Sequence, residues 1–536
     1  MDAKEQYRSL VKKDRKKIII LSLLSLLTSV VVVLFAWLSK KFIDNIQTDN
    51  FTLYLVLLIL AAVIEVVLKT FSSYLTNRYQ IDDEIKLRKD FFKKVMGSDY
   101  ATVRDNTNAE LLTLLNSDTR IVSRGVISII PQSINLISRI VLSIALLFFF
   151  DWQFALIFLG CGALVTILTS LLRKKNKELH LLLQKEESHL LNFYTQGLNS
   201  LLSLKVYGLT SSVTAKEDSV NASEKKATLK QKDFNLVINS GLLLLVRLTY
   251  VLAIIYCVYK LKDNPSYLGT LFGIVELVEE ASGPFMSLSA ITPAYYQTIG
   301  SLDRLMKLSN APSEKHLTGV TDFNSMEVRN LSYTYPDGKS VLTDVSFTLM
   351  ANQFISLCGE SGGGKSTLLK ILLGVYKPTS GEILVNNTDT NGSLNPLFGY
   401  VPQSNFLFAG TIKENLTVFN KEATVKDLDY ALEITGLTKE IKDLPQGLDT
   451  PLVDLGEGIS VGQSQRLAIA RALIASRPVL ILDEATSALD SQTESLVLHN
   501  LKNLHKTIIF VTHRPLGLEL ADNSYKLEEG RLTKLK

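Results

Sequence analysis

The chain has 536 residues, of which 46% are hydrophobic, and a formal net charge of +4. This length exceeds one ordinary hydrophobic core and predicts two or three domains. So small a charge gives no reason to expect nucleic acid as a partner. The three cysteines show neither metal-ligand spacing nor a disulfide framework.

The first part of the chain carries most of the hydrophobic residues, in segments long enough to cross a bilayer, which takes about 20 residues. Lys12, Lys13 and Arg15 precede the first segment, which is longer than the apolar part of a signal peptide. We therefore expect an uncleaved first span. The six predicted spans cover residues 18–38, 53–68, 126–150, 152–172, 234–259 and 267–291.

The connecting segments indicate the orientation. Residues 69–125 and 173–233 are long and rich in Lys and Arg, whereas the connections near Asp151 and Lys262 hold few such residues. Basic residues favour the cytoplasmic side. The pattern predicts a multi-pass protein of a bacterial cell membrane, in contact with lipid, with both termini in the cytoplasm.

The long inner segments have a helical pattern. Asp82–Met96 and Lys174–Leu191 mix charged and apolar residues at helical spacing, which predicts helices that continue beyond the membrane. Their turning points, near Leu115–Arg120 and Tyr207–Ser212, are expected to contact another domain. The alternative is a pair of solvated helical hairpins.

A change of pattern after residue 310 predicts the domain boundary. Pro312, Ser313 and Gly319 lie in a polar stretch, and short apolar strands alternating with helices follow it. We expect a transmembrane domain with six helices and cytoplasmic extensions over 1–310, a linker over 311–323 and an α/β domain over 324–536. Because no long N-terminal extension is present, we expect no fused leader peptidase.

A glycine-rich loop is the first motif in the second domain that predicts a chemical function. Phe354–Cys358 is a predicted buried strand and Ser366–Leu373 a predicted helix. Strand, glycine loop and helix form the context in which backbone N–H groups and a helix N-terminus hold phosphate. Lys365 is expected to reach the β- and γ-phosphates of ATP, and Ser366 to ligate Mg²⁺. The predicted ATP-binding residues here are Gly359, Glu360, Ser361, Gly362, Gly363, Gly364, Lys365, Ser366 and Thr367.

Two adjacent acids follow a second predicted strand, Val479–Leu482. Asp483 at the strand end is expected to hold Mg²⁺ through water, and Glu484 to polarise the attacking water. Plain surface charges are the alternative, which the position of both acids directly after four apolar residues disfavours.

Between these motifs the chain reads Ile459-Ser460-Val461-Gly462-Gln463. Together the motifs resemble those of an ABC transporter half of the exporter type. The resemblance implies a membrane all-α six-helix transmembrane domain followed by an α/β P-loop ATPase domain, the ATP-binding cassette. It also implies roles for five residues: Tyr335 stacks on adenine, Gln403 contacts Mg²⁺ and the water, Glu484 is the general base, Asp490 communicates across the dimer and His513 contacts the γ-phosphate.

The resemblance further implies a dimer. Ser460, Gly462 and Gln463 would meet the ATP held by the opposite subunit, so one chain cannot complete a site. Val461 replaces the glycine that is usual in this signature, as in some subunits of heterodimeric exporters, including thiol exporters. We expect a second, identical half-transporter as the partner, with a heterodimer as the alternative, and a switch from inward-open to outward-open on ATP binding.

Ionisable residues inside the predicted spans are candidates for a functional role such as binding the cargo, because a charge in hydrocarbon is costly. They are Glu65, Arg139, Arg247, Glu276, Glu279 and Glu280. Glu276 and Glu280 would share a helix face and could bind a cationic cargo such as a basic peptide. Alternatively they pair with Arg139 and Arg247 as internal struts.

Several functional alternatives remain at the level of sequence. The cargo could also be a lipid, a drug-like amphiphile or a small thiol. A regulatory membrane ATPase without transport is a second class of function. A soluble ATPase acting on ribosomes or DNA is disfavoured by the six spans.

Overall fold

The computed structural model describes residues 2–104, 106–314, 322–360, 362–390, 396–404, 406–452 and 459–536. The chain divides into two compact units, one of residues 1–94 and 108–309 and the other of residues 95–107 and 310–536. The short segment 95–107 therefore belongs with the C-terminal unit, although helices of the first unit flank it along the chain. The predicted linker, 311–323, includes residues 315–321, which lie outside the described residues.

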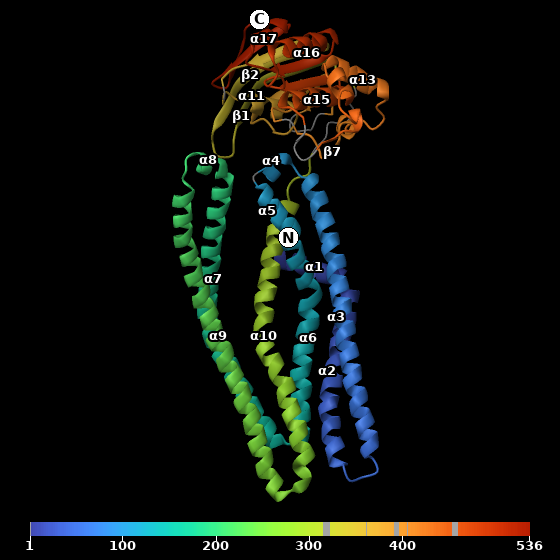
Figure 1. Cartoon of the computed structure of the whole chain (residues 1–536), viewed down its shortest axis with the longest axis vertical. Coiled ribbons are helices and arrows are strands. Elements are labelled where there is room, and N and C mark those ends of the chain that lie inside the picture. The colour runs from blue at the N-terminus through green and yellow to red at the C-terminus, as the bar shows by residue number, and fades with distance from the viewer. Residues whose placement is uncertain are drawn as a thin grey trace. The chain divides into compact units, whose positions relative to one another are not determined.

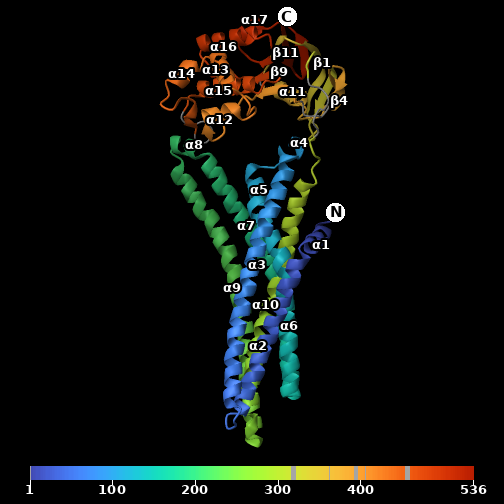
Figure 2. The same cartoon turned by 90° about the vertical axis from the view of Figure 1, so that its right-hand side faces the viewer.

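The first unit consists of long helices joined by short ones (Figures 1 and 2). They are α1 (Ala3–Lys13), α2 (Arg15–Asp44), α3 (Phe51–Met96), α5 (Asn108–Thr113), the π-helical turn η1 (Leu114–Asp118), α6 (Thr119–Phe150), α7 (Trp152–Asn199), α8 (Leu201–Val206), α9 (Thr210–Asp263), the 3₁₀ turn η2 (Pro265–Tyr267) and α10 (Leu268–Ser309). Five of the predicted spans lie within separate long helices, α2, α3, α6, α7 and α9. The sixth, 267–291, begins at the last residue of η2 and continues in α10. Within the described residues, five of these helices, all except α10, are long and apolar enough to cross a membrane.

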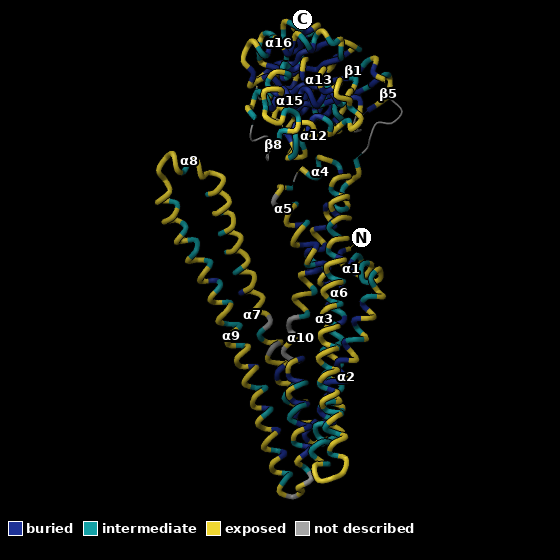
Figure 3. The backbone as a smooth tube through the Cα atoms, turned by 45° about the vertical axis from the view of Figure 1, so that its right-hand side comes forward, coloured by how far each residue is buried: buried dark blue, intermediate teal, exposed yellow. Residues whose placement is uncertain are grey.

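Large apolar side chains on these helices face outward. Leu23, Val66 and Leu171 are 60%, 64% and 71% exposed, and exposed positions line the long helices in Figure 3. A soluble protein rarely leaves so continuous an apolar surface in water, and helices are the structures that satisfy their own backbone hydrogen bonds in lipid. The chain is a multi-pass membrane protein.

Small polar side chains join α2 to α6 inside the bundle. Ser138 donates a hydrogen bond to the Ser29 hydroxyl over 2.7 Å, and the Asn135 amide donates to the Ser25 carbonyl over 3.2 Å. Such residues let helices approach closely and form bonds across the contact that lipid cannot replace. The N-terminal helix α1 is also packed, because Tyr7 is buried and meets Tyr295 of α10 edge-on at 5.5 Å.

The predicted helical extensions are confirmed, but one predicted turning point is wrong. Helices α3, α7 and α9 run for 46, 48 and 54 residues. The first turn falls at residues 97–107, whereas Leu115–Arg120 lies within continuous helix from η1 into α6. Gly97, Ser98 and Asp99 follow α3 directly, and these residue types favour turns over helix. The second turn follows α8, where Gly208 adopts a φ of +63° just before α9.

The C-terminal unit contains two main sheets and surrounding helices. Its strands are β1 (Ser325–Thr334), β2 (Ser340–Met350), β3 (Phe354–Cys358), β4 (Ser380–Val385), β5 (Thr388–Asp389), β6 (Phe398–Val401), β7 (Gly410–Thr411), β8 (Pro451–Leu452), β9 (Val479–Asp483), β10 (Thr507–Val511), β11 (Asn523–Glu528) and β12 (Arg531–Lys534). Its helices are α4 (Tyr100–Arg104), α11 (Lys365–Leu372), α12 (Ile412–Thr417), α13 (Val425–Ile434), α14 (Thr438–Lys442), the 3₁₀ turn η3 (Gly447–Asp449), α15 (Val461–Ile474), α16 (Ser491–Asn503) and α17 (Pro515–Leu520).

The larger sheet has the order β12-β11-β3-β10-β9-β6, and β11, β3, β10, β9 and β6 run parallel. Strands β3, β9 and β10 are buried at every residue, as expected for parallel strands with both faces covered. Val511 of β10 lies opposite Leu357 of β3 and Asp483 of β9. The C-terminal ends of three strands therefore lie side by side, and the loops that follow them meet. This α/β unit after a helical unit confirms the predicted fold class.

Asp151 ties together the ends of three membrane helices. Its Oδ1 accepts hydrogen bonds from the backbone N–H groups of Gln153 and Phe154, at 2.9 and 3.1 Å, and so caps α7. Its Oδ2 accepts from the hydroxyls of Tyr256 on α9, at 2.9 Å, and of Tyr267 next to α10. Burial would raise the pKa of Asp151, but these hydrogen bonds outweigh it and lower that pKa.

We predict that Asp151→Ala lowers the free energy of unfolding by about 2 kcal/mol, because the helix loses its cap and two tyrosine hydroxyls lose their acceptor. Thermal unfolding of the detergent-solubilised chain measures the effect. Asp49→Ala, at an exposed aspartate between α2 and α3, is the matched control and should leave the transition temperature unchanged. Equal transition temperatures for both variants would contradict the prediction.

Candidate functional site

The glycine loop after β3 encloses a backbone cradle. Gly359, Gly362 and Gly364 adopt φ values of +142°, +85° and +103°, which favour glycine. A Cβ atom on Gly359 would lie 2.1 Å from the Leu527 carbonyl oxygen, so the close approach of β11 also requires glycine there. Gly364 then caps the start of α11. The predicted strand, loop and helix are confirmed, while Ser361 lies outside the described residues.

Lys365 is buried within this loop. Its Nζ donates hydrogen bonds to the carbonyl oxygens of Gly359 and Glu360, at 2.6 and 2.9 Å, and the residue is only 7% exposed. Two neutral carbonyls do not balance the ammonium charge, so an anion in the cradle would be stabilised. Ser366, the next residue, is exposed on the first turn of α11.

Asp483 ends β9 within electrostatic reach of Lys365. The residue is 5% exposed, and its Oδ2 accepts a hydrogen bond from the Tyr400 hydroxyl at 3.2 Å. Burial and the neighbouring Glu484 charge raise the pKa of Asp483, against the opposing influence of Tyr400 and Lys365. A bound cation would replace the hydration that this carboxylate has lost.

The three residues predicted to be catalytic, Gln403, Glu484 and His513, meet at Glu484, the residue after Asp483. The Gln403 amide donates a hydrogen bond to Glu484 Oε2 at 2.8 Å, and His513 Nε2 lies 3.2 Å from Glu484 Oε1. Glu484 has a φ of +51°, which is strained for a residue with a side chain. Its N–H donates to the Val511 carbonyl at 3.1 Å, a contact that holds this turn against β10.

The segment after Glu484 is fixed by side chains that the sequence analysis did not single out. Gln465 donates to the Ser487 hydroxyl at 3.0 Å and accepts from the Ala488 N–H at 2.9 Å. Arg514 donates to Glu494 at 2.7 Å and to the carbonyl oxygens of Leu489 and Ser487. Gln465 lies two residues after Gln463 and Arg514 directly after His513, and this closeness to predicted motifs is the only sequence signal for them.

Asp490 begins α16 in the predicted loop. Its Oδ1 accepts from the N–H groups of Gln492 and Thr493, at 3.1 and 2.9 Å. The hydrogen bonds from Thr493 lower the pKa of Asp490, so the carboxylate stays charged at the exposed end of this helix.

Ser460 starts the helix α15 through a capping box. Its hydroxyl accepts from the Gln463 N–H at 3.2 Å, and the Gln463 side chain accepts from the Ser460 N–H at 2.8 Å. The box leaves the N–H groups of Val461 and Gly462 at the positive end of a 14-residue helix. Val461 is 68% exposed. This helix end is therefore suited to an anion presented from outside.

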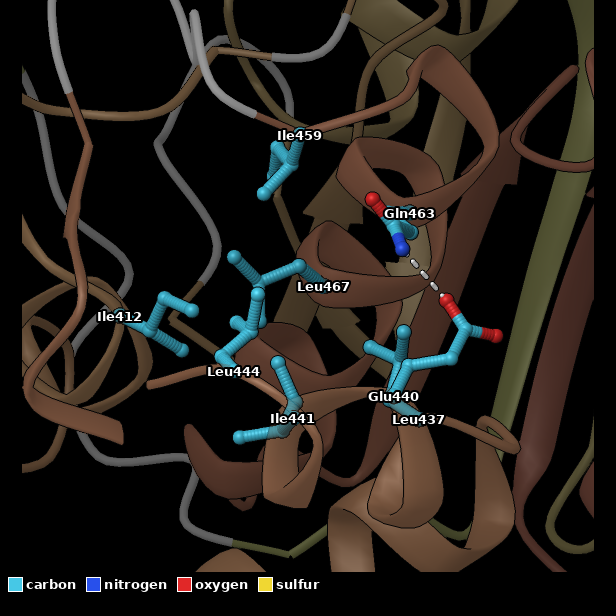
Figure 4. Close-up of a pocket in the computed structure, with 8 residues that line it drawn as sticks. All are labelled: Ile412, Leu437, Glu440, Ile441, Leu444, Ile459, Gln463 and Leu467. Carbon is cyan, nitrogen blue, oxygen red and sulfur yellow. Dashed lines mark hydrogen bonds between the residues drawn. The ribbon is translucent and has the colours of Figure 1, made fainter. Parts of the chain in front are cut away.

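Gln463 also reaches away from the helix end. Its amide donates to Glu440 at 2.7 Å, as Figure 4 shows, and Glu440 also pairs with Arg466 at 2.6 Å. These contacts fix the orientation of α15. A small pocket beside them is lined mainly by apolar side chains: Ile412, Leu437, Glu440, Ile441, Leu444, Ile459, Gln463 and Leu467. No hydrogen bond within the described residues joins Ser460 or Gly462 to the glycine loop.

Tyr335 lies beside the glycine loop. Its hydroxyl forms a hydrogen bond with Thr367 Oγ1 at 3.0 Å, and its ring meets Tyr333 edge-on at 5.0 Å. Tyr335 is half-buried.

In the membrane unit, Glu276 and Glu280 of α10 have different surroundings. Glu280 forms an ion pair with Arg139 of α6, whereas Glu276 is half-buried and lies within electrostatic reach of Glu65 on α3. Arg247 is exposed on α9.

Comparison with known proteins matches two regions of the chain to protein families. Residues 18–283 match the ABC transporter transmembrane region, and residues 342–487 match the ABC transporter family. An ABC transporter ATP-binding/permease protein of Haemophilus influenzae is 33% identical over 282 residues, 51% of this chain but only half of that relative. A multidrug resistance ABC transporter ATP-binding and permease protein of Lactococcus lactis is 28% identical over 79% of this chain and 74% of the relative.

Two further comparisons cover nearly the whole chain. The ATP-dependent lipid A-core flippase of Photobacterium profundum is 26% identical over 91% of this chain and 86% of its own. The fold is similar to a bacterial Atm1-family ABC exporter with ATP bound, with a TM-score of 0.81 at 22% identity over 97% of this chain and 94% of that one. The chain thus belongs to the ABC transporters, as an exporter half in which a helical transmembrane region precedes an α/β ATP-binding domain.

Proposed function

We propose that this chain exports a cargo across the cytoplasmic membrane by alternating access in a dimer, driven by ATP hydrolysis. The observation that carries the proposal is the contact of Gln403 and His513 with Glu484, at the sheet edge where the glycine loop also lies. A carboxylate held by two neighbours beside a phosphate cradle is arranged to activate water.

The proposed roles follow from the contacts. Glu484 accepts the proton of the attacking water, Gln403 orients that water and His513 stabilises the γ-phosphate. Lys365 and the loop N–H groups hold the phosphates, while Tyr335 stacks on adenine. The oxygens of Ser366, Gln403 and Asp483 are the hard ligands that Mg²⁺ prefers, and Mg²⁺ would offset phosphate charge when bound.

We predict that Glu484→Gln lowers ATP hydrolysis by about 100-fold or more, because it removes a positioned base. ATP binding should survive, since the glycine loop is unchanged. Turnover of the purified chain in lipid, together with equilibrium ATP binding, measures both effects. Glu382→Gln, an exposed acid paired with Arg329, is the control. Turnover near the wild-type rate in Glu484→Gln would contradict the assignment.

Exposed groups in three parts of this chain support a dimer. The α15 helix end offers N–H groups that the glycine loop of the same chain does not use, and Asp490 is exposed. At the tip of the α7–α9 hairpin, Leu202, Val206 and Tyr207 are 78%, 73% and 77% exposed, an apolar surface suited to a protein contact. We propose that the signature Ser460, Gly462 and Gln463 completes the ATP site of a partner.

Because Glu484 and His513 are both present, we expect two competent sites in a homodimer. The detergent-solubilised protein, expressed alone, should then have twice the chain mass of 59.6 kDa and hydrolyse ATP. The Val461 substitution motivates the alternative, a heterodimer. A monomer that becomes active only with a second gene product would establish the heterodimer instead.

For the cargo, we propose a cationic peptide or another cationic amphiphile. The support is the group of acids around α10. Glu276 lies within electrostatic reach of Glu279 and Glu65, while Glu65 pairs with Lys69 and Glu280 with Arg139. One relative is named a multidrug resistance ABC transporter and another a lipid A-core flippase, which supports an amphiphilic cargo. Both termini are proposed to be cytoplasmic, in a bacterial cell membrane.

We predict that Glu276→Gln abolishes stimulation of the ATPase by the cation tetraphenylphosphonium in proteoliposomes, and leaves the basal rate intact. Glu280→Gln is the matched variant. It should lower thermal stability, because it strands the Arg139 charge. Undiminished stimulation in Glu276→Gln, or wild-type stimulation only by uncharged amphiphiles, would contradict a cationic cargo at this acid.

A further inference from the structure

A continuous series of contacts runs from α4 to the glycine loop. Arg104, the last residue of α4, donates a hydrogen bond to the Tyr376 hydroxyl. Tyr376 stacks on Tyr333 with ring centroids 5.5 Å and planes 4° apart. Tyr335 meets both of these rings edge-on, at 6.1 and 5.0 Å, and its hydroxyl bonds to Thr367 in the first turn of α11.

The α4 end of this series is anchored. The Asp99 N–H donates to the Pro312 carbonyl at 2.8 Å, and Ser98 pairs with Ser313 in an antiparallel bridge. Ala101 packs against the hydrophobic core of the C-terminal unit. Arg104 is therefore presented by a segment that is anchored to the C-terminal unit. Its own side chain is exposed and also interacts directly with Tyr335.

The stacked pair depends on Arg104 for a polar reason. Tyr376 and Tyr333 are 4% and 8% exposed, so the Tyr376 hydroxyl has little access to water. A buried hydroxyl without a partner is costly, and the ring would shift to find one. The donor on Arg104 thus sets where the Tyr376 ring lies, and the Tyr333 ring is parallel to it.

The plane of Tyr335 depends in turn on these two rings. Aromatic pairs favour offset or edge-to-face geometry because of their charge distribution, so two edge-on neighbours restrict the rotation of Tyr335. A ring that stacks on a nucleotide base must keep one plane, since stacking is lost when the ring rotates. Ordering this plane before the base arrives lowers the entropic cost of binding.

We propose that Arg104 is a positioning residue for the nucleotide base, acting on the plane of Tyr335 both directly and through Tyr376 and Tyr333. The inference rests on the proposed role of Tyr335 as the base-stacking ring. Arg104 lies between α3, which ends at Met96, and α5, which begins at Asn108, and both belong to the membrane unit. Base binding and the position of this segment are therefore linked, and the linkage acts in both directions.

The test compares ATP with inorganic tripolyphosphate, which has the phosphates but no base. Equilibrium binding of each is measured to the full chain in lipid nanodiscs, with EDTA present to prevent hydrolysis. Arg104→Gln removes the donor, and Tyr376→Phe removes the acceptor while it keeps the ring. Each variant should weaken ATP binding about three- to tenfold and leave tripolyphosphate binding unchanged, and Tyr376→Phe should add nothing to Arg104→Gln in the double variant.

Two controls separate this effect from a general one. Arg329→Gln, in an exposed ion pair on β1, should change neither affinity. The thermal transition of each variant without nucleotide reports on folding, and Tyr376→Phe keeps the stacked rings even if Arg104→Gln is destabilised. Equal weakening of both ligands, or of neither, by Arg104→Gln and Tyr376→Phe would overturn the inference.

Tyr335→Ala distinguishes this failure from a failure of the proposed function. If it weakens ATP but not tripolyphosphate, Tyr335 reads the base, and unaffected Arg104 and Tyr376 variants overturn the positioning role alone. If Tyr335→Ala leaves ATP binding unchanged, the base-stacking role is wrong and the positioning role falls with it.

Discussion

The parallel pairing of β3, β10 and β9 is the constraint on which the ATP-binding unit depends. Parallel strands bring their carboxyl ends to one edge, so the glycine loop, Asp483–Glu484 and His513 converge although they are far apart in sequence. Burial of all three strands fixes their register, because a shift by one residue would turn every side chain to the other face. The residues with proposed chemical roles lie in or next to loops, and the sheet determines where those loops meet.

Around this edge, strain and polar contacts are concentrated in the turn after β9. Glu484 adopts a positive φ that few residues with side chains tolerate, and the surrounding bonds to Gln403 and Val511 hold it there. Gln465 and Arg514 then fix the backbone that leads to Asp490. Such a turn persists only when its neighbours determine it, which is typical of sites that must be ordered before substrate binds.

The two units have surfaces suited to different surroundings, lipid for the long helices and water for the C-terminal unit. The long helices expose large apolar side chains and join through serine and asparagine contacts, an arrangement suited to lipid. The C-terminal unit buries its apolar residues around a sheet, as proteins in water do. Residues 95–107 cross this division, since they are flanked by membrane helices but pack with the ATP-binding unit. Helix α4 therefore packs with the ATP-binding unit, while the chain on both sides of it continues into helices of the membrane unit.

The sequence by itself determined the six apolar helices, the strands β3 and β9 and the glycine loop, because hydrophobic runs and turn residues act locally. Tertiary structure decided the rest. The first turn was predicted too far along the chain, near Leu115–Arg120, although Gly97, Ser98 and Asp99 favour a turn by residue type. The packing of residues 95–107 with the C-terminal unit places the turn there. The Arg139–Glu280 pair, the hydrogen bonds of Gln465 and the stacking of Tyr333 on Tyr376 join residues distant in sequence. No local pattern encodes such partners, because they are set by which helices and strands pack side by side.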